Sequence, residues 1–152
     1  MSMSSSFVYG FGFHCNFEWE KWIKFIHNHK ETFCQSEKEK KLYQDLQECI
    51  KNKCDPENIF EDYACQSTEV RGIGASVSNI MSRETGIRFI YCPPDSDCDT
   101  LASVVFEQGY PWNWNETERH LTYDKLFDIC KKYMDELGIE ESPDFLNLEY
   151  YG

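Results

Sequence analysis

The stretch from Arg71 to Cys92, RGIGASVSNIMSRETGIRFIYC, decides the fold of this chain. Three of its apolar residues recur at helical spacing: Val77, Ile80 and Met81. A serine stands where it could cap the start of this helix, at Ser76 or Ser78. Gly86 stands where a left-handed residue ends a helix, and a β-rich run follows over residues 87–92. The stretch predicts a short strand, a helix and a second strand, and we expect this unit to lie in the core.

Period-2 patterns predict strands at both ends of the chain and in its middle. Residues 7–14, FVYGFGFH, alternate aromatic with small or polar residues, which predicts a strand with its aromatic side buried. Residues 101–108 and 145–151 are also predicted to be strands. Together with the run over 87–92, these segments supply a sheet of about four to five strands.

Helix signals are concentrated before and after these strands. A stripe of apolar residues predicts a helix from Asn16 to about Thr32. Ser36 and Glu39 form a capping box for a second helix, and Asp55-Pro56 opens a short third one. Thr122 opens a helix that Gly138 closes. We therefore expect one globular α+β domain over residues 1–152, with a mixed or mainly antiparallel sheet and helices packed on one face.

Charge is distributed unevenly along the chain, whose net charge is −12. Residues 1–54 carry eight Lys and seven Asp or Glu, whereas residues 55–152 carry seven Lys or Arg and twenty Asp or Glu. Nucleic-acid binding depends on neutralising phosphates with Lys and Arg. This charge distribution disfavours direct nucleic-acid binding and favours a protein partner with a basic surface.

The compartment is inferred from the cysteines and the N-terminus. The N-terminal residues MSMSSSFVYG lack a basic region followed by an apolar run, and no apolar run approaches the roughly 20 residues of a membrane span. We therefore expect a cytoplasmic protein that does not bind membranes and whose eight cysteines are reduced.

An aromatic loop with acidic neighbours is the candidate interaction site. Trp112 and Trp114 alternate with asparagines in the loop, and their side chains should face opposite ways, so we expect one to anchor the core and the other to be exposed. Tryptophan is enriched in binding hot spots. Glu116 and Glu118 follow, and a Pro-Pro turn upstream opens a second acidic loop. The full candidate set is Asp95, Asp97, Asp99, Trp112, Trp114, Glu116 and Glu118.

An anion-binding site is the alternative. Residues 72–78 form a turn in which glycines are followed by serines, and this turn leads into the predicted helix. Backbone N–H groups at the start of a helix bind anions. Three of the four arginines lie in or beside this unit. The pattern lacks the third glycine of a dinucleotide site and the lysine of a P-loop. The candidate residues are Arg71, Gly72, Gly74, Ser76, Ser78, Arg83 and Arg88.

The sequence contains no catalytic signature that we can assign, and we expect neither a metal nor a cofactor. The segment Asp95-x-Asp97-x-Asp99 begins like a calcium loop, but Thr100 and Phe106 occupy the positions that need glycine and glutamate. Cys15 precedes the first predicted helix, where a thiol would gain nucleophilicity. The neighbouring His14 would point to the opposite face of the strand, so a catalytic pair would need a distant histidine.

Two functional hypotheses follow. The first is a non-enzymatic acidic interaction module, such as an inhibitor or immunity-type protein that masks a basic nucleic-acid-binding surface on its target. The second is a domain that binds an anion or small molecule, with or without catalysis, at the turn over 72–78.

Overall fold

The computed structural model of the chain describes residues 5–16, 19–52, 72–92, 101–107 and 111–151. The strands are β1 (Ser5–His14), β2 (Phe89–Cys92), β3 (Ser103–Glu107) and β4 (Asp144–Tyr151). The longer helices are α1 (Trp19–Asn28), α3 (Glu37–Lys51), α5 (Gly72–Thr85) and α7 (Tyr123–Glu136). The shorter ones are α2 (Lys30–Phe33), α6 (Glu116–Arg119) and the 3-10 turn η1 (Pro111–Asn113).

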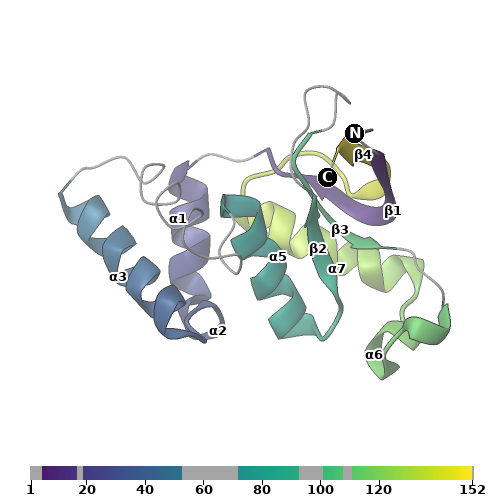
Figure 1. Cartoon of the computed structure of the whole chain (residues 1–152), viewed down its shortest axis with the longest axis horizontal. Coiled ribbons are helices and arrows are strands. Elements are labelled where there is room, and N and C mark those ends of the chain that lie inside the picture. The colour runs from purple at the N-terminus through teal and green to yellow at the C-terminus, as the bar shows by residue number, and fades with distance from the viewer. Residues whose placement is uncertain (1–4, 17–18, 53–71, 93–100, 108–110, 152) are drawn as a thin grey trace, which may run out of the picture.

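The four strands form one antiparallel sheet in the order β2-β3-β1-β4. β1 lies inside the sheet between β3 and β4. Its residue Phe11 pairs with Phe106 of β3 on one side and with Phe145 of β4 on the other. In Figure 1, α5 lies between the sheet and the helices α1 to α3, which extend to one end of the molecule. The prediction of an α+β fold with a mainly antiparallel sheet is confirmed.

One face of the sheet carries the main core. Phe11 and Phe13 of β1 lie on this face beside the β3 residues with which they pair, Phe106 and Val104. Apolar residues of the helices complete the same cluster, among them Trp22, Phe25, Phe33, Leu42, Ile80, Met81 and Met134. The helices therefore pack on one face of the sheet, as the sequence predicts, because that is the face where the large aromatic residues of β1 lie.

The opposite face carries a smaller cluster of buried residues. Val8 of β1, Val105 of β3, Cys92 of β2 and Leu148 of β4 form it. These side chains come from all four strands, so each strand has a buried side chain on this face. The sheet is thus apolar on both faces, and both β3 and the central part of β1 alternate between two buried sides.

The aromatic side of β1 is only half buried, which corrects the sequence prediction. Phe11 and Phe13 are buried, whereas Phe7 and Tyr9 on the same face are exposed. The period-2 pattern assigns all four residues to one side, but it does not show how far along the strand the helices extend.

The helix of the stretch 71–92, α5, begins earlier than predicted, and among the described residues of this stretch no short strand precedes it. α5 starts at Gly72, so Ser76 and Ser78 lie inside it and are buried, and neither caps its start. Ser76 Oγ accepts a hydrogen bond from Trp22 Nε1 at 3.0 Å, and Ser78 Oγ donates to the Ala75 carbonyl at 2.9 Å. These bonds satisfy hydroxyls that would otherwise disfavour the helix. The predicted left-handed stop is confirmed, because Gly86 has a φ of 75°.

Other helix predictions have mixed outcomes. The Ser36–Glu39 capping box of α3 is present, and Thr122 caps α7 as predicted. The first predicted helix is divided into α1 and α2 at His29, whose φ of −111° and ψ of 24° are not helical. The helix predicted after Asp55 lies outside the described residues.

Gly10 and Gly12 let β1 and β3 approach each other closely. A Cβ atom on Gly12 would lie 1.9 Å from the Val104 carbonyl oxygen, and one on Gly10 would lie 2.5 Å from that of Phe106. Both obstacles are backbone atoms of a buried strand, which cannot rotate away. The small residues between the aromatic ones are therefore a steric requirement of the central strand pair.

We expect Gly12→Ala to destabilise the protein by about 1–3 kcal/mol, the usual cost of an extra methyl group in a packed core. The added Cβ would force β1 away from β3. Urea denaturation followed by circular dichroism measures the effect. Asn147→Ala, at an exposed position of β4, is the control and should change stability by less than about 0.5 kcal/mol. Equal stability of the two variants would show that β1 and β3 separate without cost.

Candidate functional site

The predicted tryptophan loop combines one exposed and one packed indole. Trp112 lies in η1 and is 71% exposed. Trp114 is partly buried, and its ring centroid lies 5.6 Å from that of Phe106 in the core. The alternation predicted from the sequence, with one anchor and one exposed ring, is present.

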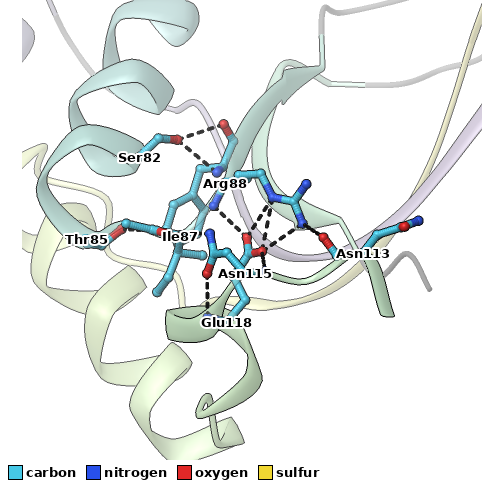
Figure 2. A network of polar contacts seen from close by, with 9 residues as sticks. Ser82, Thr85, Ile87, Arg88, Asn113, Asn115 and Glu118 are labelled. Atoms are coloured by element: carbon cyan, nitrogen blue, oxygen red, sulfur yellow. Dashed lines mark hydrogen bonds and ion pairs between the residues drawn. The ribbon is translucent and has the colours of Figure 1, made fainter. Parts of the chain in front are cut away.

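A buried carboxylate holds this loop. Glu118 of α6 is 0% exposed, and both of its oxygens accept hydrogen bonds (Figure 2). Oε1 accepts from Arg88 Nη2 at 2.8 Å and from the Asn115 backbone N–H at 2.9 Å. Oε2 accepts from the Arg88 backbone N–H at 2.9 Å, and Arg88 Nε lies 3.1 Å from each oxygen. This carboxylate therefore joins α6 to the residue that immediately precedes β2.

Two further bonds fix the loop to the turn after α5. Arg88 Nη2 also donates to the Asn113 carbonyl at 2.7 Å, and Asn115 Nδ2 donates to the Gly86 carbonyl at 2.9 Å (Figure 2). Asn115 additionally caps α6 by accepting from the Glu118 N–H at 2.8 Å. The residues on both sides of Trp114 are thus bound to the α5–β2 connection, Asn113 through its carbonyl and Asn115 through its side chain.

The pairing shifts the pKa of both partners. Burial alone would raise the pKa of Glu118, but the hydrogen bonds from Arg88 and Asn115 and the Arg88 charge lower it below its usual 4.5. The hydrogen bond to Glu118 and its charge raise the pKa of Arg88. The ionised pair therefore stabilises the fold above about pH 4.5, and this contribution is lost as the pH falls through the pKa of Glu118 in the folded state.

The structure separates the predicted interaction residues into two groups. Trp112 and Glu116 are exposed, and Glu116 lies 3.1 Å from the ring of His120. Glu118 is buried beneath them, so it supports the loop and is not part of its surface. Asp95, Asp97 and Asp99 lie outside the described residues.

The sequence contained a signal for the α6 turn that the prediction did not use. Asn115-x-x-Glu118 is a capping box, and both reciprocal bonds are present. A glutamate in that box is expected to turn back onto the helix start. The pattern would have predicted a helical turn here and a satisfied, inward carboxylate at position 118.

A pocket of about 380 Å³ lies beside the tryptophan loop. It is lined by Arg88, Ile90, Phe106, Glu107, Asn113, Trp114 and Glu118. Glu107 is exposed, whereas the Arg88 guanidinium binds Glu118. The pocket therefore combines apolar walls with a carboxylate, a combination suited to the side chain of a lysine or arginine.

The anion-binding residues do not form one basic site. Gly72 and Gly74 lie in the first turn of α5, Ser76 bonds to Trp22, and Arg71 lies outside the described residues. Ser78 and Arg83 do line a common pocket of about 590 Å³. The buried Glu39 also lines it, and its Oε2 lies 2.8 Å from Arg83 Nη1. Arg88 is bound to Glu118 elsewhere, so both described arginines of this set already hold carboxylates.

A histidine bridge joins the helices at a third point. His29 Nδ1 lies 2.7 Å from Glu84 Oε2 of α5, and its Nε2 lies 2.8 Å from Glu136 Oε2 of α7. Glu84 also accepts from Thr32 Oγ1 at 2.9 Å and from the Tyr133 hydroxyl at 2.8 Å. No local sequence pattern indicates this cluster, because its members are up to 107 residues apart.

Charges around His29 favour its protonated form. Burial lowers the pKa of His29, but the hydrogen bonds to Glu84 and Glu136 and their negative charges outweigh burial and raise it above its usual 6.5. Burial likewise opposes ionisation of Glu84, but the bonds from His29, Tyr133 and Thr32 lower its pKa. These contacts therefore favour a protonated imidazole between the two carboxylates.

Four cysteines, Cys15, Cys34, Cys92 and Cys130, are free thiols whose pKa values are raised. Burial raises the pKa of Cys15 and Cys130 to about 12 and that of Cys92 to about 11, and it also raises that of Cys34. The thiolate that an activated Cys15 would need is therefore disfavoured. Within the described ranges, no group of three His, Cys, Asp or Glu residues is placed to hold a metal ion.

No protein-family model, curated protein or solved structure matches this chain. Of the helices that the structure describes, none has the length and apolar character needed to cross a bilayer. Functional inference therefore depends on the arrangement of the residues themselves.

We expect Glu118→Ala to destabilise the protein by about 1–3 kcal/mol, because it leaves the backbone N–H groups of Arg88 and Asn115 without their acceptor. Glu118→Gln keeps one carbonyl acceptor and should cost less. Glu116→Ala is the matched control in the same helix, and it should have an effect below about 1 kcal/mol because Glu116 is 83% exposed. Chemical denaturation measures all three variants, and equal effects at positions 116 and 118 would contradict a buried, bonded Glu118.

The His29 bridge predicts a pH-dependent part of the stability. Since the pKa of His29 is raised on folding, its contribution should be complete below about pH 6.5 and decrease as the pH rises through the pKa of the folded state. Denaturation midpoints measured from pH 5 to 9 should therefore decline in the wild type and decline less in His29→Gln. His120→Gln, at an exposed position, should retain the wild-type profile. Identical profiles for wild type and His29→Gln would show that the bridge is not formed.

Proposed function

We propose that the chain is a non-enzymatic interaction module that binds a protein partner with a basic surface. In this proposal it acts as an inhibitor or immunity-type protein that covers a nucleic-acid-binding surface on its target. It does so in the cytoplasm, where its thiols stay reduced. The observation that carries the proposal is the exposed Trp112 on a loop that the Arg88–Glu118 pair and Asn115 bind to the body of the protein.

Rigid presentation supports a binding role for Trp112. A side chain that is ordered before binding loses less conformational freedom on association, so more of its contact energy contributes to affinity. The buried carboxylate beneath the loop supplies that order. Exposed tryptophan on a well-fixed loop is typical of the central residues of protein interfaces.

Charge supports the choice of a basic partner. Glu107 and Glu116 are exposed on either side of the tryptophans along the chain. Beyond them, further exposed carboxylates continue along α7 and the following segment: Asp124, Asp128, Asp135, Glu140, Glu141 and Asp144. Arg119, Lys125 and Lys132 are exposed cations within this region, fewer than the exposed acids. The excess of acids would accelerate encounter with a basic surface and repel nucleic acid.

The rival proposal, an anion- or small-molecule-binding domain, has less support. Its described arginines are occupied by Glu39 and Glu118, and the pocket that contains Arg83 also contains the Glu39 carboxylate. An anion entering there would compete with a bond that is already made. The interaction module uses groups that are exposed, and we therefore prefer it.

We expect Trp112→Ala and Glu116→Lys to affect different rate constants for binding a basic nucleic-acid-binding protein captured at low salt. Removing the indole should weaken binding by about 2 kcal/mol or more, mainly through faster dissociation, because buried contact area is lost. Reversing the exposed charge should mainly slow association and flatten its salt dependence, because exposed charges steer encounter within about 8–10 Å. Surface plasmon resonance at several salt concentrations separates the two effects.

Matched controls lie on α3. Ile50 is an exposed apolar residue and Glu48 an exposed acid, so Ile50→Ala and Glu48→Lys repeat the two kinds of change away from the loop. Both should bind with wild-type rate constants. Binding that survives the loop substitutions unchanged would reject the loop as the interface. Indifference to every basic protein at low salt would reject the proposed function.

A further inference from the structure

A second exposed feature lies where β1 and β4 extend beyond the helices. Four aromatic residues form it, and we call them the aromatic face: Phe7 (64% exposed), Tyr9 (50%), Tyr123 (54%) and Phe145 (39%). Folded monomers seldom leave several large rings exposed in contact with one another, and such patches usually mark binding surfaces. The tryptophan loop shares none of these residues.

Strand register places the rings on one side of the sheet. Phe145 is the direct partner of Phe11, and directly paired residues of antiparallel strands point to the same face. Tyr9 lies two residues before Phe11 and therefore shares that face, and Tyr123 adds a ring from the first turn of α7. The Tyr9 and Phe145 rings are stacked with centroids 5.9 Å apart at 9°, and those of Tyr123 and Phe145 are 6.2 Å apart at 23°. Three rings therefore form one row of nearly parallel planes.

A buried ring supports this row. Phe11, which is fully buried, lies edge-on to Phe145 at 5.1 Å and to Tyr123 at 5.4 Å, both at 73°. Edge-to-face contacts of this kind are favourable. The exposed rings are therefore packed against the core and keep their spacing without a ligand.

Two carboxylates adjoin the aromatic face. Asp124 follows Tyr123 and is exposed. Asp144 Oδ1 accepts from the Phe145 backbone N–H at 2.8 Å, but Asp144 pairs with Gly12 and so belongs to the opposite face of the sheet. Glu149 is the direct partner of Phe7 in the sheet. Across residues 5–14, 123–128 and 144–151 there are four Asp or Glu residues and a single Lys or Arg, Lys125. This charge disfavours phosphate groups and a second copy of the same acidic face.

We propose that the aromatic face binds arginine side chains of a basic protein segment. A guanidinium group is planar and stacks on aromatic rings, where the π electrons attract its charge, and carboxylates at the rim add a second attraction. The partly exposed rings are held at fixed spacing, and the adjoining acids Asp124 and Glu149 favour a cation. This inference rests on the proposed function in one respect, that the partner is basic. It assigns the arginine contacts to residues outside the tryptophan loop.

The test uses two synthetic peptides, one of alternating arginine and glycine and one in which lysine replaces every arginine. Fluorescence anisotropy at low salt should show tighter binding of the arginine peptide. The double variant Tyr9→Leu/Tyr123→Leu keeps apolar side chains but removes two π faces, so it should bind the arginine peptide about fivefold or more weakly. Tyr9→Phe/Tyr123→Phe keeps the rings and should bind like the wild type. Thermal melts of both variants confirm that they fold.

The outcomes separate this inference from the proposed function. If the leucine variant binds the arginine peptide as tightly as the wild type, the inference is overturned, while peptide binding that depends on Trp112 would still support the interaction module. Preferential binding of single-stranded oligonucleotide to the aromatic face would also overturn it. So would a dimer in sedimentation that the leucine substitutions dissociate. Absence of binding to either peptide and to every basic protein would reject the proposed function and the inference together.

Discussion

The buried Glu118 carboxylate is the constraint on which the placement of the tryptophan loop depends. An ionised carboxylate removed from water is costly unless nearly all of its acceptor capacity is used. Here the donors are the Arg88 backbone and guanidinium and the Asn115 backbone, which come from segments about 30 residues apart in the sequence. The carboxylate is satisfied only when α6, the loop and the start of β2 take their observed positions. The exposure of Trp112 is therefore a consequence of the bonds beneath it.

Charged side chains also join distant segments at two places on α5. Arg83, near the end of α5, binds Glu39 and also donates to the Thr32 and Phe33 carbonyls at the end of α2. Glu84, the next residue, accepts from His29, Thr32 and Tyr133. Adjacent residues of α5 thus bind α2, α3 and α7. Apolar packing holds the helices against the sheet, and these charged contacts specify their positions.

Local signals in the sequence predicted most of the elements but few of these contacts. The alternation in β1, the capping box of α3 and the Thr122 cap of α7 depend on residues within one segment, so the pattern alone reveals them. The predicted start of α5 was wrong. Glycines and serines have a weak helix preference, and here the contact between Trp22 and Ser76 within the core overrides it. The capping box Asn115-x-x-Glu118 indicates that Glu118 turns inward, but the bond of this carboxylate to the distant Arg88 leaves no local signal in the sequence. The exposure of Phe7 and Tyr9 depends on how far the helices extend over the sheet. A period-2 pattern does not indicate that extent.

Acidic residues consequently have two distinct roles in this protein. Glu39, Glu84 and Glu118 bind cationic side chains within the fold, whereas Asp124 and Glu149 adjoin exposed aromatic residues, since Asp124 follows Tyr123 and Glu149 pairs with Phe7. An exposed acid next to a solvated surface contributes only to solubility, but an acid next to a preorganised ring also lowers the cost of placing a cation there. Net charge alone therefore does not distinguish a solubilising surface from a binding one. The distinction comes from the rings, because Phe11 fixes Phe145 and Tyr123 in positions that solubility would not require.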